Sequence, residues 1–83
     1  RGVRMAPRSP SLYLALAKTR LAMGQYRSAT QMAQRAVSLL PAQPRGAEQT
    51  AKAEAWIVIA QAREKQGDRE GAAHARANAQ AVW

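Results

Sequence analysis

The stretch from Tyr13 to Pro41 reads YLALAKTRLAMGQYRSATQMAQRAVSLLP, and its spaced pattern recurs 43 residues further on. Both copies hold an aromatic residue, an aliphatic residue followed by alanine, an arginine, a glycine turn and two spaced alanines. The copies are Tyr13-x-x-Leu16-Ala17-x-x-Arg20, Gly24-Gln25-Tyr26, Ala29, Ala36 and Pro41, and Trp56-x-x-Ile59-Ala60-x-x-Arg63, Gly67-Asp68-Arg69, Ala72 and Ala79. A shorter similarity pairs residues 2–10 with residues 36–44, at an offset of 34. Because one such unit cannot bury its apolar side alone, the pattern predicts stacked helical hairpins, the first of them truncated.

The chain is predicted to be all-α. Alanine makes up about a quarter of the sequence and phenylalanine is absent, a composition that favours helices. Ser9 and Pro10 form a helix start signal, with Ser9 placed to cap the free backbone N–H groups. The expected helices span residues 10–23, 26–39, 47–66 and 68–82. Short glycine turns within each pair force the paired helices to be antiparallel.

The expected organisation is a short α-solenoid that forms the C-terminal part of a longer array. Its parts are residues 1–9 as the tail of a preceding repeat, 10–41 as a first hairpin, 42–46 as a loop and 47–83 as a second hairpin. The 43-residue offset exceeds the 34-residue one by nine, and we place these nine residues between Pro41 and Trp56. Since residues 47–53 contain no helix breaker, the insertion is predicted to lengthen the third helix by about two turns.

The net charge of +8 is unevenly distributed. All five acidic residues lie after residue 47, whereas residues 1–47 contain eight arginines or lysines and no acid. This asymmetry favours an acidic partner or an acidic neighbouring segment. The alternative is that the arginines only solubilise an alanine-rich helical surface. Cysteine is absent, so the sequence leaves the redox compartment and the localisation open.

The repeated pattern resembles that of tetratricopeptide repeat (TPR) proteins. The resemblance covers residues 11–41 and 53–83, with a partial unit at 1–10, and rests on the joint spacing of one set of residues. These are Leu16, Gly24, Tyr26, Ala29, Ala36 and Pro41. Two positions depart from the family: Arg20 and Arg63 stand where it usually has tyrosine, and Ala33 and Arg76 where it has a large aromatic residue.

The TPR resemblance implies a non-catalytic scaffold that binds a peptide or a partner helix on a concave face lined by the first helix of each repeat. Mapped onto this sequence, the expected groove residues are Leu14, Lys18, Leu21, Ile57, Val58 and Gln61. Lys18 is expected to contact an acidic or carbonyl group of the partner. The alternative for the Leu14 and Leu21 stripe is that a neighbouring helix covers it.

The end of the chain is predicted to be a capping repeat that faces water. Arg76 and the polar fourth helix would make a poor contact with any following repeat. Trp83 either folds back over the last hairpin or stands at a cut end.

No enzyme activity, cofactor, metal or small-molecule substrate is expected. The chain has one histidine, His74, in a polar stretch, and its acids are scattered over exposed helical positions. The five glycines are dispersed and form no phosphate-binding loop.

Two other functions remain as alternatives. Arg27 and Arg35 lie two turns apart and could form a basic strip that binds an anionic polymer, such as a nucleic acid or polysaccharide, without sequence specificity. The chain could also be an accessory TPR segment of a larger enzyme or assembly factor. No apolar run reaches the roughly 18 to 20 residues that a membrane-spanning helix needs, so a membrane is not an expected partner.

Overall fold

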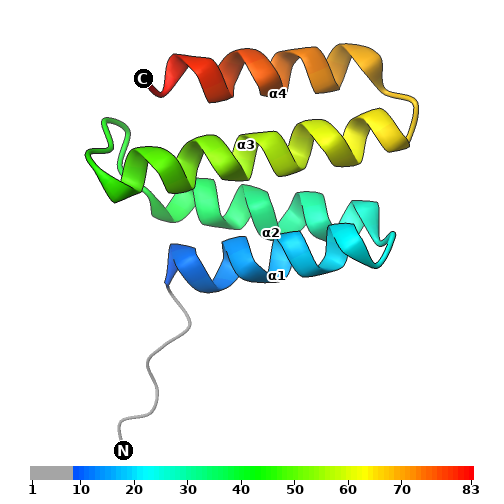
Figure 1. Ribbon diagram of the computed structural model, residues 1–83, viewed down its shortest axis with the longest axis horizontal. Coiled ribbons are helices and arrows are strands. Elements are labelled where there is room, and N and C mark those ends of the chain that lie inside the picture. Colours follow the sequence, from blue (N-terminus) through cyan, green and yellow to red (C-terminus); the bar gives the residue numbers. More distant parts are fainter. Residues whose placement is uncertain (1–8) are drawn as a thin grey trace, which may run out of the picture.

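The computed structural model describes residues 9–83, which form four α-helices packed against each other (Figure 1). These are α1 (Pro10–Ala22), α2 (Tyr26–Leu39), α3 (Ala47–Lys65) and α4 (Arg69–Ala81). No strand occurs among these residues. The predicted tail of a preceding repeat lies, except for Ser9, outside the described residues.

The helix ends follow from a few local signals. Gly24 and Gly67 have φ angles of 78° and 86° at the turns that follow α1 and α3, a conformation that glycine adopts without steric cost. The Asp68 carboxylate caps α4 by accepting a hydrogen bond from Gly71 N at 2.9 Å. Ser9 does occupy the N-cap position of α1, but its side chain makes no capping hydrogen bond; its backbone carbonyl accepts from Leu12 N and Tyr13 N instead.

The nine-residue insertion takes the form expected from its composition. The connection after α2 turns at Gly46, which has a φ of 56°, and α3 then begins at Ala47. At 19 residues, α3 is the longest helix, compared with 13 residues for α1. The inserted turns therefore project α3 beyond the ends of the helices beside it.

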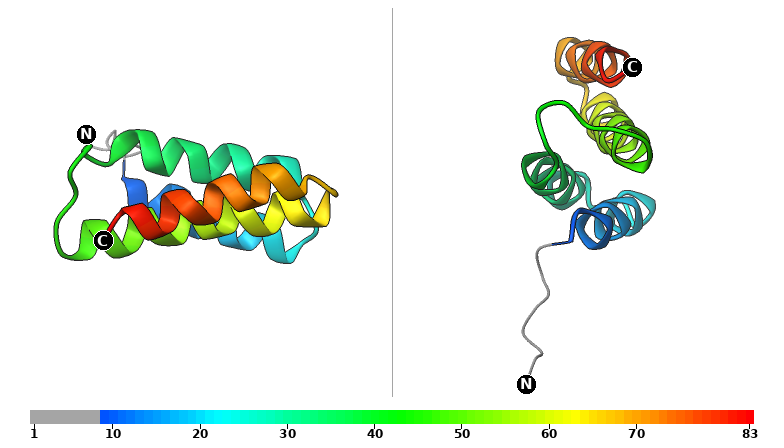
Figure 2. Two further views of the ribbon diagram at one scale, coloured as in Figure 1. Left: turned by 90° about the horizontal axis from the view of Figure 1, so that it is seen from above. Right: turned by 90° about the vertical axis from the view of Figure 1, so that its left-hand side faces the viewer.

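The four helices form a zigzag row, which is clearest when they are viewed end-on (Figure 2). α2 packs on α1 and α3, α3 also packs on α1, and α4 packs on α3 alone among the described helices. The resulting body measures 44 × 29 × 14 Å, so it is thin in one direction. α3 is the central element because it contacts the other three helices.

Alanine dominates the core. Ala17, Ala29 and Ala33 are fully buried, as are Ala60 and Ala75, and such small side chains let the helix backbones approach closely. Ile59 is the only large side chain that is completely buried among the described residues. Larger, half-buried side chains such as those of Tyr13 and Trp56 pack around this alanine-rich centre.

Candidate binding groove between α1 and α3

A hollow of about 510 Å³ lies between α1 and α3. Its lining combines aliphatic side chains with several polar or charged ones. The lining residues are Lys18, Leu21, Thr50, Ala53, Glu54, Ile57, Val58, Gln61 and Trp83. We call this hollow the inner groove.

Five of the six residues predicted to form a groove line this hollow. They are Lys18 and Leu21 on α1 and Ile57, Val58 and Gln61 on α3. They meet there because residues three or four apart on a helix share a face. Leu14 is not among the lining residues, and its side chain, which is 8% exposed, belongs to the hydrophobic core. Val58 is also a core residue, but part of its surface reaches the groove. At Leu14 the second apolar stripe of α1 is therefore covered within the protein.

An ion pair joins two lining residues of the inner groove, one from α1 and one from α3. Lys18 Nζ donates a hydrogen bond to Glu54 Oε1 at 2.7 Å, and both side chains are about half exposed. An exposed pair of this kind contributes little to stability, typically about 0–1 kcal/mol. It does orient the Lys18 ammonium, which keeps further N–H donors for a ligand. Since the Glu54 carboxylate already neighbours that ammonium, a ligand carbonyl suits Lys18 better than a second carboxylate.

Besides Glu54, the groove is lined by three further residues that were not predicted from the sequence as groove residues. Thr50 and Ala53 lie in the inserted turns of α3, on the face that also carries Ile57, so their helical spacing from Ile57 was an available signal. Trp83 follows α4 and its side chain is 69% exposed at the groove. No periodicity could place Trp83, because it lies beyond the last helix.

The groove is followed toward the glycine turns by a second, smaller hollow of about 420 Å³. Leu21 and Gln61 line both hollows, and Glu64 and Arg76 form part of the second. Arg76 Nη2 donates to Glu64 Oε1 at 2.7 Å and so links α4 to α3. This hydrogen bond, together with the positive charge of Arg76, lowers the pKa of the Glu64 carboxyl group.

Replacing Arg76 with glutamine should raise the pKa of Glu64 toward its ordinary value, which an NMR titration of its side-chain carboxyl carbon would measure. The same change at Arg69, the weakest contributor to the lowered pKa, should raise it less. Because the folded-state pKa is the lower one, the pair stabilises the protein above the unfolded-state pKa. This contribution is lost as the pH falls through the lowered folded-state pKa. An unaltered Glu64 pKa in the Arg76 variant would contradict the ion pair.

The two arginines proposed from the sequence as a basic surface are in different situations. Arg27 is exposed on α2. The Arg35 guanidinium lies over the ring of Tyr13, 5.7 Å from its centroid, in a cation–π contact. The Arg35 side chain is therefore held in a contact within the protein. Arg27 is the one of the two whose positive charge is more available to a partner.

Metal sites and membrane-spanning helices are both lacking within residues 9–83. No group of three or more His, Cys, Asp or Glu side chains that could hold a metal ion occurs there, and His74 is exposed on α4. No helix in the same range is both long enough and apolar enough to cross a membrane.

Comparison with known proteins gives no assignment: no protein-family model, no curated protein and no solved structure matches this chain.

Proposed function

We propose that this protein is a non-catalytic interaction module that binds a peptide or a partner helix in the inner groove. The observation that carries the proposal is the convergence of Leu21, Ile57 and Val58 from two helices on one open hollow that polar side chains also line. Apolar grooves with a few placed polar groups suit an amphipathic peptide, whose apolar side chains fill the hollow. Lys18 and Gln61 would then hydrogen-bond the peptide's carbonyl groups.

The repeated sequence and the contacts of α3 support a TPR-like arrangement of the two hairpins. Ala55 and Ile59, on α3, are fully buried in a helix that packs on both helices of the first hairpin. The residues 43 positions earlier are Leu12 and Leu16 on α1. Leu12 is 46% exposed and Leu16 is half-buried. We propose that a further helix resembling α2 covers this α1 face in the full array.

At the other end of the row of helices, the face of α4 that points away from α3 is polar. Ala33 is fully buried in α2, and the corresponding residue of α4 is the exposed Arg76. Likewise Val37, which packs against the core, corresponds to the exposed Gln80. Because this face of α4 is polar, it can remain in contact with water and needs no further helix to cover it. We therefore propose that α4 is the capping helix at the end of the array.

Selection from a random peptide display library tests the groove. The enriched peptides should bind the unaltered protein in a fluorescence anisotropy titration. A variant carrying Leu21→Asp and Ile57→Asp should lose at least about 30-fold in affinity, since residues at the centre of an interface typically contribute 2 kcal/mol or more. The double variant should keep its helical circular dichroism, because neither side chain is fully buried.

The matched control for this experiment is Leu12→Asp, a leucine on the same helix that does not line the groove. It should bind the selected peptides within about twofold of the unaltered protein. Peptides that bind the double variant as well as they bind the unaltered protein would remove the groove as the binding site. A selection that enriches no peptide would count equally against the proposal.

A further inference from the structure

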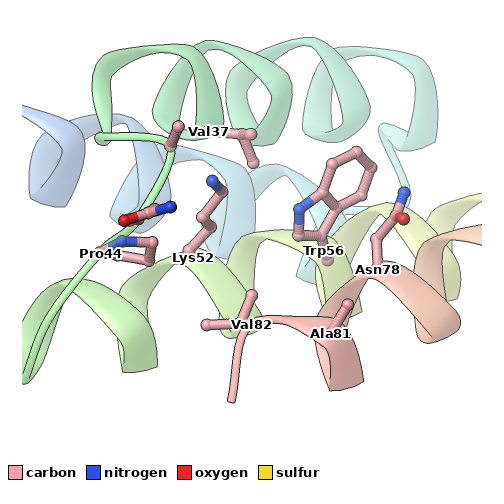
Figure 3. Close-up of a pocket in the computed structure, with 9 residues that line it drawn as sticks. Val37, Pro44, Lys52, Trp56, Asn78, Ala81 and Val82 are labelled. Atoms are coloured by element: carbon pink, nitrogen blue, oxygen red, sulfur yellow. The ribbon is translucent and has the colours of Figure 1, made fainter.

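A further hollow, of about 460 Å³, lies on the other side of α3, between α2 and α4 (Figure 3). We call it the outer hollow. Its lining residues are Val37, Ala42, Gln43, Pro44, Lys52, Trp56, Asn78, Ala81 and Val82. None of them lines the inner groove, so the two hollows are separate. Its volume lies within the range of small-molecule sites, roughly 300–1,000 Å³.

The connection from α2 and the first turns of α3 build one wall of the outer hollow. Ala42, Gln43 and Pro44, together with Lys52 on α3, come from the stretch that contains the nine additional residues. Ala42, Gln43 and Pro44 still follow the 34-residue offset, whereas Lys52 lies in the inserted turns of α3. The insertion therefore supplies the cationic residue of the hollow.

The indole ring of Trp56 lies inside the hollow, between Lys52 and Asn78 in Figure 3. Trp56 corresponds to Tyr13 in the first hairpin, where the Arg35 guanidinium covers the tyrosine ring. The residue that corresponds to Arg35 is Asn78, whose side chain is much shorter. The guanidinium group of Arg35 fills the space over the Tyr13 ring. The corresponding space beside the Trp56 ring is open, because Asn78 is too short to fill it.

The polar groups around this ring favour an anion. Lys52 Nζ donates to Pro41 O at 3.2 Å, and an ammonium group has three N–H donors, so two are left for a ligand. None of the described residues that line the hollow is acidic, and the chain as a whole carries a charge of +8. Val37 and Val82 add aliphatic walls on either side.

We propose that the outer hollow binds an aromatic carboxylate, with the ligand ring against Trp56 and its carboxylate on Lys52. The ligand is either a free aromatic acid or the C-terminal aromatic residue of a peptide. Aromatic ring pairs and a charge-assisted hydrogen bond both contribute to such a complex. This site is independent of the inner groove and would exist even if the groove bound nothing.

The two tryptophans make the test specific, because Trp56 lies in the outer hollow and Trp83 at the inner groove. N-acetyl-phenylalanine should shift the indole N–H resonance of Trp56 saturably, with a dissociation constant of the order of 1 mM, and leave that of Trp83 unmoved. A Trp83→Phe variant assigns the two resonances. The uncharged amide of the same ligand should bind about tenfold more weakly.

Two variants separate the parts of the site. Lys52→Met should weaken binding of the acid about tenfold, whereas Lys65→Met, at the far end of α3, should not change it. Asn78→Arg should abolish binding by covering Trp56 as Arg35 covers Tyr13, although it adds positive charge. Tighter binding by the Asn78→Arg variant would contradict the stacking of the ligand ring on Trp56. Equal binding of the acid and the amide would contradict the contact between the ligand carboxylate and Lys52.

The source of the ligand follows from a third titration, with the peptide Gly-Gly-Phe carrying a free C-terminus. Binding tighter than that of N-acetyl-phenylalanine assigns the site to a peptide C-terminus, and equal or weaker binding assigns it to a free acid. If neither ligand shifts the Trp56 resonance up to its solubility limit, the proposal is wrong. That result would not bear on the proposed function of the inner groove, because the groove is tested with selected peptides in an anisotropy titration and not with the Trp56 resonance.

Discussion

Replacing Ile59 with alanine is expected to lower the free energy of unfolding by about 2–5 kcal/mol, as large-to-small core substitutions generally do. Ile59 is completely buried in α3, the one helix that contacts the other three, so the cavity would lie where the described helices meet. A domain of this size has only a few kcal/mol to lose. The variant should therefore be largely unfolded near room temperature, which urea titration followed by circular dichroism would show.

Ile57→Ala is the matched control, since the residue type and the helix are the same. Ile57 is 38% exposed and lines the inner groove, so its loss should cost less than about 1 kcal/mol. Equal destabilisation by the two substitutions would mean that the core is not where the structure places it. The comparison also separates stability from binding, because Ile57 is expected to matter for peptide affinity.

A second large effect is expected when α1 is given a preceding hairpin. In a tandem variant, residues 1–9 are replaced by a second copy of residues 10–43, which keeps the 34-residue offset found in the sequence. The added α2-like helix should bury the Leu12 and Leu16 face of the original α1. We expect a gain of about 2–4 kcal/mol in the free energy of unfolding, since burying a leucine is worth about 1.5–3 kcal/mol.

A substitution tests where that gain comes from. Leu16→Ala in the original hairpin should cost about 1–2 kcal/mol more in the tandem variant than in the unaltered chain, because Leu16 becomes as buried as Ile59. Sedimentation equilibrium should show a monomer in both cases. A tandem variant that unfolds in two separate transitions, or with no gain in stability, would argue against stacking on α1. A dimer of the unaltered chain would point instead to a second copy as the occupant of this face.

Much of the local structure could be predicted from single residues in the sequence. Gly24 and Gly67 determine where α1 and α3 end, because only glycine takes up the left-handed conformation without strain. Pro41 and Pro44 mark the long connection between α2 and α3. The alanine spacing predicted which sides of α2 and α4 are buried, since residues three and four apart share a helical face.

The candidate groove could be predicted in part. Helical spacing placed Lys18 with Leu21, and Ile57 with Gln61, on common faces, and the structure brings these faces together. Leu14 shares the α1 face but is buried, because what covers a residue depends on how the next helix crosses it. The position of Trp83 at the groove could not be predicted, since no repeating pattern extends past α4.

For this protein, sequence alone was sufficient to specify four helices, their turns and their alanine-rich faces, because these depend on neighbours within a few residues along the chain. Tertiary structure alone decided which faces remain open. The Lys18–Glu54 pair joins residues 36 positions apart. The ring of the half-buried Trp56 faces a hollow because Asn78, on α4, has a short side chain. Such contacts are set by the distances and rotations between packed helices, which residue spacing within a single helix does not contain.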